Sequence, residues 1–303
     1  MTKTVKSIYR CPDCGWESPR WVGRCGQCQA WGSLEECQPV TGAATRPVRA
    51  AVPITAVDPT AIQRTLTGIG EFDRVLGGGL VPGAVVLLAG EPGVGKSTLL
   101  LAAAARWAQD HGPTLYVSGE ESVGQIRLRA VRTGVEQATL LVAAETDLTA
   151  VVGQIEQVNP TLVIVDSVQT VTDPATVGTA GGVAQVKAVA ATLVQVAKQR
   201  GVPVILIGHV TKDGAVAGPR TLEHLVDVVI SFEGDPHSGF RLIRATKNRF
   251  GPADEVGCFE LTEAGIREVA DPSGLFTSRH GQPVPGTALS VTVEGRRPLL
   301  AEV

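Results

Sequence analysis

The segment Gly90–Ser97 constrains this chain more than any other, because it matches the phosphate-binding pattern G-x-x-x-x-G-K-[ST] at every position. It follows the apolar run Val85–Ala89 and precedes a helical pattern from Thr98 onward. Glycines let such a loop curl so that its backbone N–H groups face one anion at a helix N-terminus. The sequence therefore predicts a strand–loop–helix unit that holds the phosphates of a nucleotide.

The residues of this loop have separate predicted tasks. We expect Lys96 to reach the β- and γ-phosphates of ATP and the Ser97 hydroxyl to bind Mg²⁺. A glycine-rich turn that matches the pattern by chance is the alternative, and the flanking strand and helix patterns disfavour it. The predicted nucleotide-binding residues are Gly90, Glu91, Pro92, Gly93, Val94, Gly95, Lys96, Ser97 and Thr98.

Apolar runs and helical patterns alternate from about residue 63 onward, which predicts an α/β fold with a parallel sheet covered on both faces. The predicted strands are Ala84–Ala89, Pro113–Ser118, Thr139–Ala143, Leu162–Asp166 and Val202–Gly208, and the predicted helices are Thr98–Gln109, Ser122–Thr133, Leu148–Val158 and Gly182–Arg200. Three shorter runs that follow predict hairpin-type antiparallel strands at one edge of the sheet: Val226–Phe232, Gly239–Lys247 and Glu255–Thr262. An aromatic content of only 4% suits parallel strands buried on both faces.

Three polar side chains lie at or just after the carboxyl ends of predicted strands, where α/β proteins bind ligands. Asp166 is expected to hold Mg²⁺ through water. Glu120 is predicted to be the catalytic base that polarises the attacking water, whereas Glu121 suits a helix start. His209 is a candidate sensor of the γ-phosphate, and a purely structural histidine is an equally good interpretation.

Four of the six cysteines stand in two C-x₂-C pairs near the N-terminus. Each pair can supply two thiolates to one ion, so the pairs complete a tetrahedral zinc site with no open position for catalysis. A segment of about 30 residues has little core, and the metal would supply the missing stability. Disulfides and iron–sulfur ligation are alternatives that the compartment and the spacing disfavour. The predicted zinc ligands are Cys11, Cys14, Cys25 and Cys28, and Cys37 and Cys258 are expected to be small buried side chains.

Composition limits the classes of function. The 303 residues carry a formal net charge of −3, so contact with DNA would need a local basic surface or a channel shared by several subunits. No run approaches the roughly 20 apolar residues of a membrane span, and Met1–Arg10 lacks the apolar core of a signal peptide. We therefore expect a cytoplasmic protein without membrane contact.

Three motifs resemble the RadA (Sms) family of bacterial DNA repair proteins: Trp21-Val-Gly-Arg-Cys25 with Trp31-Gly, Gly77-Gly-Gly-Leu-Val-Pro-Gly83, and Lys247-Asn-Arg-Phe-Gly251. The resemblance covers essentially the whole chain, and the last motif is close to diagnostic. It implies a RecA-like P-loop ATPase that forms homo-hexameric rings related to DnaB-type helicases. It also implies movement on single-stranded DNA and extension of recombination intermediates (D-loops and branches) together with a RecA-type recombinase.

The motif Lys247–Gly251 is needed for ATPase and branch-migration function in that family. The resemblance therefore adds Lys247 and Arg249 to Lys96 and Glu120 as predicted catalytic residues. In an extended segment these two cations lie on one face, and from a sheet edge they could reach the γ-phosphate held by a neighbouring subunit. A solvated hairpin whose charges face water is the alternative.

Two predicted loops, Thr170–Gly182 and Lys212–Arg220, follow strand ends where RecA-like proteins place the loops that line the DNA channel. The candidate DNA contacts are Lys187, Lys212 and Arg220, and each is equally well explained as an ordinary surface cation. A ring could concentrate these charges despite the acidic total.

The resemblance also implies a domain organisation. RadA-like proteins continue into a Lon-protease-like domain that helps to hold the hexamer, and this chain from about Ser273 resembles only the opening of that domain. The expected parts are a zinc-binding module at 1–38, a linker at 39–62, a RecA-like ATPase domain at 63–270 and the start of the Lon-like domain at 271–303. We hypothesise that the sequence is a piece of a longer protein, which would weaken the hexamer.

Two other functions compete with a DNA motor. In the first, ATP only sets the conformation, and the zinc ribbon recruits a recombination partner without motor activity. DNA-stimulated hydrolysis favours the motor, whereas negligible turnover with partner binding lost on Cys28→Ser favours the binding module. The second is an ATP-dependent protease, for which no Ser–Lys dyad can be assigned in the sequence.

Overall fold

The computed structural model divides the chain into two compact units, Met1–Asp58 and Pro59–Val303. The described residues are 8–12, 14, 16–18, 20–32, 34–37, 51–58, 63–210, 221–234, 239–275 and 286–303. Of the expected linker, only residues 51–58 are described, and they contain a short 3₁₀ helix, η1 (Ile54–Ala56), whose side chains are exposed.

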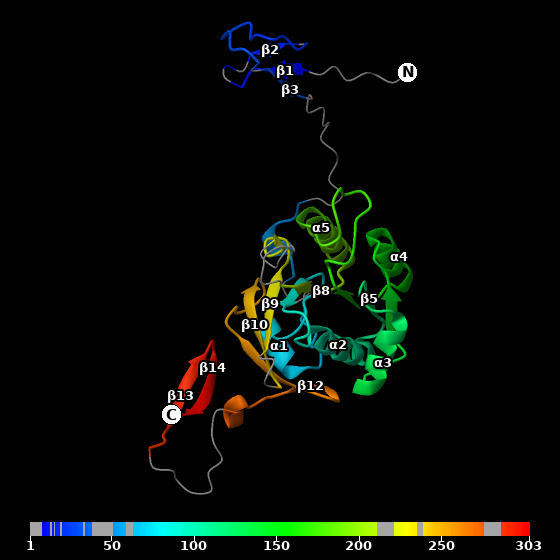
Figure 1. Ribbon diagram of the computed structural model, residues 1–303, viewed down its shortest axis with the longest axis vertical. Coiled ribbons are helices and arrows are strands. Elements are labelled where there is room, and N and C mark those ends of the chain that lie inside the picture. The colour runs from blue at the N-terminus through cyan, green and yellow to red at the C-terminus, as the bar shows by residue number, and fades with distance from the viewer. Residues whose placement is uncertain are drawn as a thin grey trace. The chain divides into compact units, whose positions relative to one another are not determined.

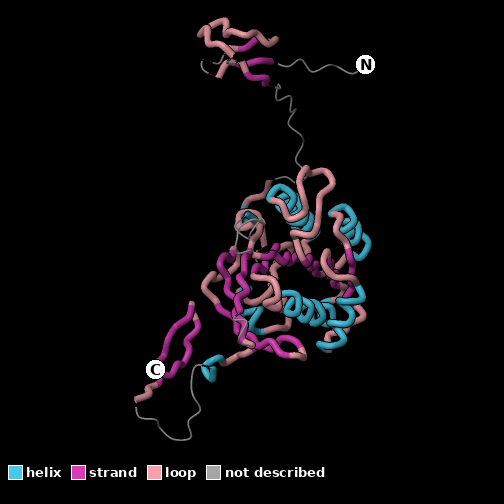
Figure 2. The backbone as a smooth tube through the Cα atoms, viewed as in Figure 1, coloured by secondary structure: helices cyan, strands magenta, loops and turns pink. Residues whose placement is uncertain are grey.

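The N-terminal unit is a small antiparallel sheet whose described strands are β1 (Ile8–Arg10), β2 (Glu17–Ser18) and β3 (Glu35–Cys37), in the order β2-β1-β3. Figure 2 draws the strands of this unit in magenta. Among the described residues its buried apolar cluster consists of Cys11, Cys25 and Leu34, with Trp16 packed against it. The packing is close, because a Cβ on Gly26 would lie 2.7 Å from the Trp16 ring. So small a core cannot stabilise a unit of this size by itself.

The second unit is built on one sheet, in which nine described strands pair in the order β12-β11-β10-β9-β4-β8-β7-β5-β6 (Figure 1). β4 pairs in parallel with β8, β8 with β7, β7 with β5 and β5 with β6, so the predicted parallel core is confirmed. The strands are β4 (Val85–Gly90), β5 (Thr114–Ser118), β6 (Leu140–Ala144), β7 (Leu162–Asp166), β8 (Val204–His209), β9 (Val228–Gly234), β10 (Phe240–Asn248), β11 (Val256–Thr262) and β12 (Gly265–Glu268).

The antiparallel part of the sheet differs from the prediction in two respects, of which the first is the additional strand β12. β9 was expected to be a hairpin-type antiparallel strand, but it joins the parallel core, because it pairs in parallel with β4 and antiparallel only with β10. Antiparallel pairing then continues from β10 to β11 and from β11 to β12. Because β8 and β9 both pair in parallel with β4, the two strands run in the same direction and cannot form a hairpin with each other.

Helices cover both faces of this sheet (Figure 1). Successive side chains of β4 point to opposite faces: Val86 and Leu88 belong to the core formed with α1, α2 and α3, and Val85 and Leu87 to the core formed with α4 and α5. The helices are α1 (Gly70–Leu76), α2 (Lys96–His111), α3 (Val123–Thr133), α4 (Leu148–Val158) and α5 (Val183–Arg200). The four predicted helices are confirmed, whereas α1 was missed because seven residues are too short for a periodic pattern. None of the described helices combines the length and the apolar character needed to cross a membrane.

A C-terminal hairpin is tied to this unit by a buried ion pair. It consists of β13 (Leu289–Glu294) and β14 (Arg297–Glu302), and the 3₁₀ helix η4 (Pro272–Leu275) precedes it. Arg297 is 6% exposed and donates hydrogen bonds to the carboxylate of Glu71 in α1 and to three backbone carbonyls. The same carboxylate accepts the backbone N–H of Cys258 at 2.9 Å. Each buried charge therefore has several partners, as the stability of a buried ion pair requires.

Replacing Arg297 by Met should lower the free energy of unfolding by about 3–5 kcal/mol, because Glu71 would remain as an unpaired buried charge. The double variant Glu71→Met/Arg297→Met should recover part of that loss, since it leaves no buried charge. Arg296→Met is the matched control: this neighbouring arginine is exposed and lies 3.8 Å from Glu255, so its loss should cost less than about 1 kcal/mol. Urea unfolding measures all three, and equal losses for the two single variants would contradict the assignment.

Candidate functional site

The phosphate-loop residues form the turn between β4 and α2. Gly93 and Gly95 have φ angles of 79° and 109°, a region that residues with side chains avoid. Gly90 is constrained differently, because a Cβ there would lie 2.4 Å from the carbonyl oxygen of Phe232 in β9. α2 begins at Lys96, so the loop surrounds a helix N-terminus, where backbone N–H groups are directed at an anion.

Lys96 is buried at the base of this loop. It is 3% exposed, and its ammonium group donates hydrogen bonds to the backbone carbonyls of Gly90 and Glu91 at 2.9 and 2.7 Å. Burial lowers the pKa of Lys96 to about 8, and the negative charges of Asp166 and Glu120 partly offset that effect. A phosphate oxygen can replace the carbonyls as acceptor and would form a stronger, charge-assisted bond.

A cavity of about 310 Å³ lies beside the loop. The predicted residues that line it include Lys96, Ser97, Thr98, Glu120, Asp166 and His209. Glu121 and Arg129 also line it, and sequence reasoning gave Arg129 no role. Lys247 and Arg249 are not among its lining residues.

Three side chains with potential metal-binding atoms meet at the carboxyl ends of neighbouring parallel strands. Glu120 follows β5, Asp166 ends β7 and His209 ends β8, and one ligand atom of each lies within 4.8 Å of the others. Oε1 of Glu120 accepts the Ser167 hydroxyl at 2.7 Å and lies 3.0 Å from Nε2 of His209. The Tyr116 hydroxyl donates to Asp166 at 2.6 Å, and burial and the charge of Asp166 raise the pKa of Tyr116, so the hydroxyl stays protonated. Ser167 and Tyr116 were missed because neither belongs to a recognisable motif.

The adjacent carboxylates of Glu120 and Glu121 have different partners. The backbone N–H groups of both residues lie 3.3 and 3.0 Å from the Ser118 hydroxyl, which accepts from them and holds the turn after β5. Glu121 then pairs with Arg129 of α3 at 2.7 Å, whereas the Glu120 side chain is 43% exposed and contacts His209. The geometry agrees with the choice of Glu120 over Glu121, and its role as catalytic base stays a prediction.

Lys247 and Arg249 do not lie on one face of a strand at a sheet edge, as the sequence suggested. β10 is an inner strand between β9 and β11, its register shifts just before Lys247, and it ends at Asn248, so Arg249 lies beyond it. The Lys247 ammonium donates to the backbone carbonyls of Glu223 and Val226, and burial and the nearby Arg249 charge lower the pKa of Lys247. The Arg249 side chain is 54% exposed. Lys247 thus holds the segment before β9, while Arg249 faces outward.

Asp227 holds this region together. It is 4% exposed, and its carboxylate accepts hydrogen bonds from Lys198 at 2.6 Å, from Arg249 at 3.2 Å and from the backbone N–H of Val85 at 3.0 Å. Val85 starts β4, and the phosphate loop begins at the other end of that strand, at Gly90. Five residue steps along a strand span roughly 16 Å. Arg249 is therefore at the opposite end of the sheet from the cavity of its own chain.

The candidate DNA contacts are only partly within the described residues. Lys187 is described and lies exposed on α5. Lys212 and Arg220, with the whole of the second predicted loop, lie outside the described residues. The first predicted loop, Thr170–Gly182, is described, and its Val177 is 95% exposed. DNA contact by these residues stays a prediction.

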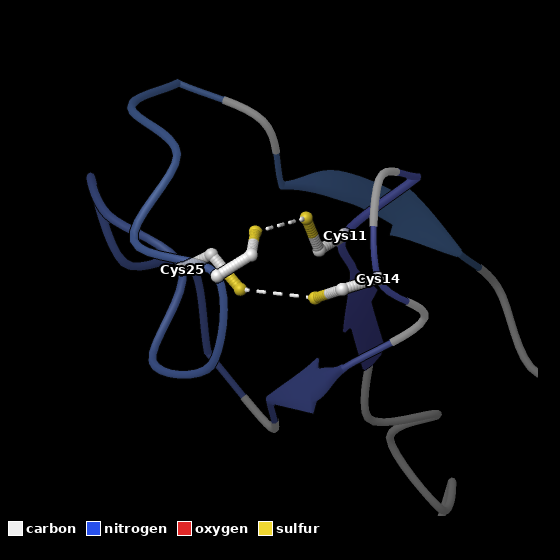
Figure 3. Close-up of side chains that lie close together, drawn as sticks. Cys11, Cys14 and Cys25 are labelled. Carbon is white, nitrogen blue, oxygen red and sulfur yellow. Dashed lines mark hydrogen bonds between the residues drawn. The ribbon is translucent and has the colours of Figure 1, made fainter.

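Four cysteine sulfur atoms converge in the N-terminal unit (Figure 3). The sulfur of Cys11 lies 3.6 Å from that of Cys28, and the sulfur of Cys14 lies 3.5 Å from that of Cys25. A tetrahedral ion with Zn–S bonds of about 2.3 Å places its sulfurs about 3.8 Å apart, whereas a disulfide needs about 2.05 Å. The backbone N–H of Gln27 also donates to the Cys25 sulfur at 3.4 Å, as expected beside a thiolate. The residues present therefore fit one zinc ion.

Of the two remaining cysteines, only Cys258 has a described side chain. Cys258 is 4% exposed, as expected of a small buried side chain, and burial raises the pKa of its thiol. Cys37 is in β3, and its side chain lies outside the described part of the structure.

Comparisons with known proteins agree with this geometry. A model of the AAA domain matches residues 58–215, and a model of the rubredoxin metal binding domain matches residues 9–36. The crystal structure of a KaiC-like protein from Pyrococcus horikoshii OT3 has a TM-score of 0.54 and 20% identity, covering 69% of this chain and 99% of that one. The RadB recombinase has a TM-score of 0.52 and 24% identity, covering 67% and 98%. Fold and site together define a RecA-like P-loop ATPase with an N-terminal four-cysteine zinc ribbon.

Sequence relatives narrow this class to one family. The DNA repair protein RadA of Mycolicibacterium smegmatis is 54% identical over 99% of this chain and 67% of its own length. RadA of Mycobacterium tuberculosis is 56% identical over 99% of this chain and 64% of its own length. RadA of Bacillus subtilis is 44% identical over 100% of this chain and 68% of its own length. The chain belongs to the family of the bacterial DNA repair protein RadA. It spans 64–68% of the length of these relatives.

Replacing Cys25 by Ser should reduce the bound zinc from about one ion per chain, because a structural site needs all four thiolates. Cys258→Ser is the matched control, since it removes a buried cysteine outside the cluster and should leave the zinc content unchanged. Mass spectrometry of the metals in the purified chains gives the measurement. Full zinc content in Cys25→Ser, or iron in place of zinc in the unaltered chain, would contradict the assignment.

The affinity for ATP should fall as the pH rises above about 8. The pKa of Lys96 is lowered to about 8, so the ammonium is charged below that pH and loses its proton above it. Phosphate binding then requires proton uptake, and the affinity should fall by up to about tenfold per pH unit. Calorimetric titrations at pH 7 and pH 9 measure the Kd for ATP. Lys96→Arg keeps its charge at both pH values, so its Kd should change less between them than that of the unaltered chain. An affinity of the unaltered chain that does not depend on pH would contradict this mechanism.

Proposed function

We propose that this chain is the ATP-hydrolysing part of a ring motor that moves on single-stranded DNA and promotes branch migration and D-loop extension in recombinational repair. The observation that carries the proposal is the cavity where Lys96, Glu120, Asp166 and His209 meet beside the phosphate loop. The relatives, which are named DNA repair proteins, supply the DNA context. The proposed partners are single-stranded DNA, recombination intermediates and a RecA-type recombinase, with a homo-hexamer as the working assembly.

The phosphate loop and Lys96 bind the β- and γ-phosphates and neutralise part of their charge. Ser97 and Asp166 would hold Mg²⁺, which supplies further positive charge at these phosphates when bound. The donor set fits this ion, because hydroxyl and carboxylate oxygens are the ligands that it prefers. Tyr116 keeps the Asp166 carboxylate in place through its hydroxyl group.

Glu120 accepts a proton from the water molecule that attacks the γ-phosphate. The Ser167 hydroxyl and His209 hold its carboxylate, so its orientation is set before the substrate binds. The carbonyl of His209 also accepts a hydrogen bond from Gln169 at 3.2 Å. A movement of His209 when the γ-phosphate leaves would therefore reach Gln169, in the segment after β7 that leads into the first predicted DNA loop.

Arg249 acts across a subunit boundary in this proposal. It is exposed and lies roughly 16 Å, the length of β4, from the phosphate end of its own sheet, so it cannot serve the cavity of its own chain. In a ring, Arg249 could reach the γ-phosphate that a neighbouring subunit binds. A cation supplied in trans in this way accelerates hydrolysis by about 10³–10⁵-fold. Lys247 supports the same motif by holding the segment that leads into β9.

A second candidate is an ATP-switched module whose zinc ribbon recruits a recombination partner without motor activity. The observation in its favour is the surface of the ribbon, where Trp21 and Trp31 are 57% and 77% exposed. The guanidinium of Arg24 lies 5.6 Å from the centre of the Trp31 ring. Tryptophan and arginine are enriched at protein interfaces, so this surface is suited to a partner.

Single-stranded DNA should stimulate ATP hydrolysis by this chain, and Lys96→Ala and Glu120→Gln should each abolish it. Arg249→Ala should lower the stimulated rate by about 10³-fold. In the proposed ring, each active site takes Lys96 from one subunit and Arg249 from its neighbour. Mixing Lys96→Ala with Arg249→Ala should therefore restore activity at interfaces that combine an intact Lys96 with an intact Arg249. Arg267→Ala, which alters an exposed arginine on β12, is the control.

DNA-independent hydrolysis that Arg249→Ala leaves unchanged would contradict the motor and leave only a nucleotide-binding fold. Nucleotide binding with negligible turnover, together with capture of a recombinase that Cys28→Ser abolishes, would favour the second candidate. A mixture no more active than its two inactive components would contradict the action of Arg249 in trans.

A further inference from the structure

Arg129 lines the nucleotide cavity, yet neither the family motifs nor the proposed mechanism gives it a task. Its side chain is 14% exposed, and one terminal nitrogen, Nη2, lies 2.7 Å from Oε2 of Glu121. This contact is an ion pair without hydrogen-bond geometry. Within the part of the chain that the structure describes, Nε and Nη2 of Arg129 are both buried and lack a hydrogen-bond acceptor.

Unpaired donors of this kind call for a physical explanation. A buried N–H group without an acceptor is unfavourable, and more so on a charged group, so folded proteins rarely retain one unless a ligand or an ion completes it. The guanidinium is a planar fork with several donors, so one edge can face Glu121 while another binds a second anion. The neighbouring cavity is lined by the phosphate loop and by Lys96, whose N–H groups can donate hydrogen bonds to phosphate oxygens.

The fold holds Arg129 in position from both sides. α3 starts directly after the carboxylate turn, where Ser122 and Gln125 form a reciprocal capping box. Ile126 and Ala130 are the buried residues of this helix, so Arg129, between them, lies on the side that faces the core. Side chains of a helix lean toward its N-terminus, which directs the long Arg129 side chain back toward the turn that carries Glu121.

We propose that Arg129 binds the γ-phosphate of the nucleotide held by its own chain and that Glu121 is the counter-ion that orients it before the nucleotide arrives. The proposal rests on the proposed ATP site. The γ-phosphate is the expected partner because Glu121 adjoins Glu120, whose carboxylate faces the place where that phosphate is attacked. The two carboxylates thus divide their work: Glu120 serves the attacking water, and Glu121 serves the arginine. This contact is made within one subunit, unlike that proposed for Arg249.

Calorimetric titration of the whole chain with two probes tests this assignment: the non-hydrolysable ATP analogue AMP-PNP, which has a terminal phosphate, and ADP, which lacks it. Arg129→Gln should weaken AMP-PNP binding by about tenfold to a hundredfold, the loss expected for a hydrogen bond to a charged group, and ADP binding by less than about threefold. Arg129→Lys keeps the charge but loses the planar fork of donors. Its affinity for AMP-PNP should therefore lie between those of Arg129→Gln and the unaltered chain. Arg127→Gln is the matched control, because that arginine is 67% exposed on the same helix and pairs with Glu136.

Arg129 variants that bind AMP-PNP as tightly as the unaltered chain would overturn the proposal and leave Arg129 a structural partner of Glu121. An equal loss for both probes would overturn the assignment to the γ-phosphate. If Arg129→Gln is unstable, the rise in Tm that each probe causes in Arg129→Lys, relative to that variant without nucleotide, gives the same comparison. An unaltered chain that binds neither probe would instead overturn the ATP site itself, and this proposal with it.

Discussion

Parallel pairing of neighbouring strands is the constraint on which the candidate active site depends. The carboxyl ends of parallel strands that lie side by side are close together, so residues far apart in the chain meet there. These residues are Lys96 after β4, Glu120 after β5, Asp166 at the end of β7 and His209 at the end of β8. This convergence buries charge, and the pKa of Lys96, lowered to about 8, reflects it. The charges of Asp166 and Glu120 and the carbonyls that Lys96 contacts stabilise its ammonium group, and a phosphate oxygen can take the place of the carbonyls.

A second cluster of charged side chains, centred on Asp227, lies at the opposite end of these strands. A carboxylate 4% exposed there accepts hydrogen bonds from Lys198, from Arg249 and from the first residue of β4. The phosphate loop thus follows one end of β4, whereas Asp227, which holds Arg249, is bonded to the first residue at the other end. Under the proposed function, this separation is the physical reason for a ring, because only a second subunit can bring Arg249 to a phosphate.

The N-terminal unit meets a different constraint, the shortage of apolar side chains. Its described core is a cluster of two cysteines and one leucine, with Trp16 against it, which is too little to stabilise a fold without help. Sulfur atoms 3.5 and 3.6 Å apart are arranged for an ion, and the metal would take the place of a hydrophobic core. In the larger unit, the buried pair of Glu71 and Arg297 ties the C-terminal hairpin to α1, although the two residues are 226 positions apart.

Features that depend on neighbours in the chain could be predicted from the sequence by itself. The phosphate loop, the cysteine pairs and the alternation of strands and helices each follow from local spacing, because glycine conformation, metal geometry and hydrophobic period act over short distances. The acid at the end of β7 could be placed for the same reason. Only the tertiary structure decided which strands are neighbours, and with that the parallel pairing of β9 and the inner position of β10. It also decided the partners of Lys247 and Arg129, because a side chain's environment is set by segments that lie far away in the sequence and carry no local signal.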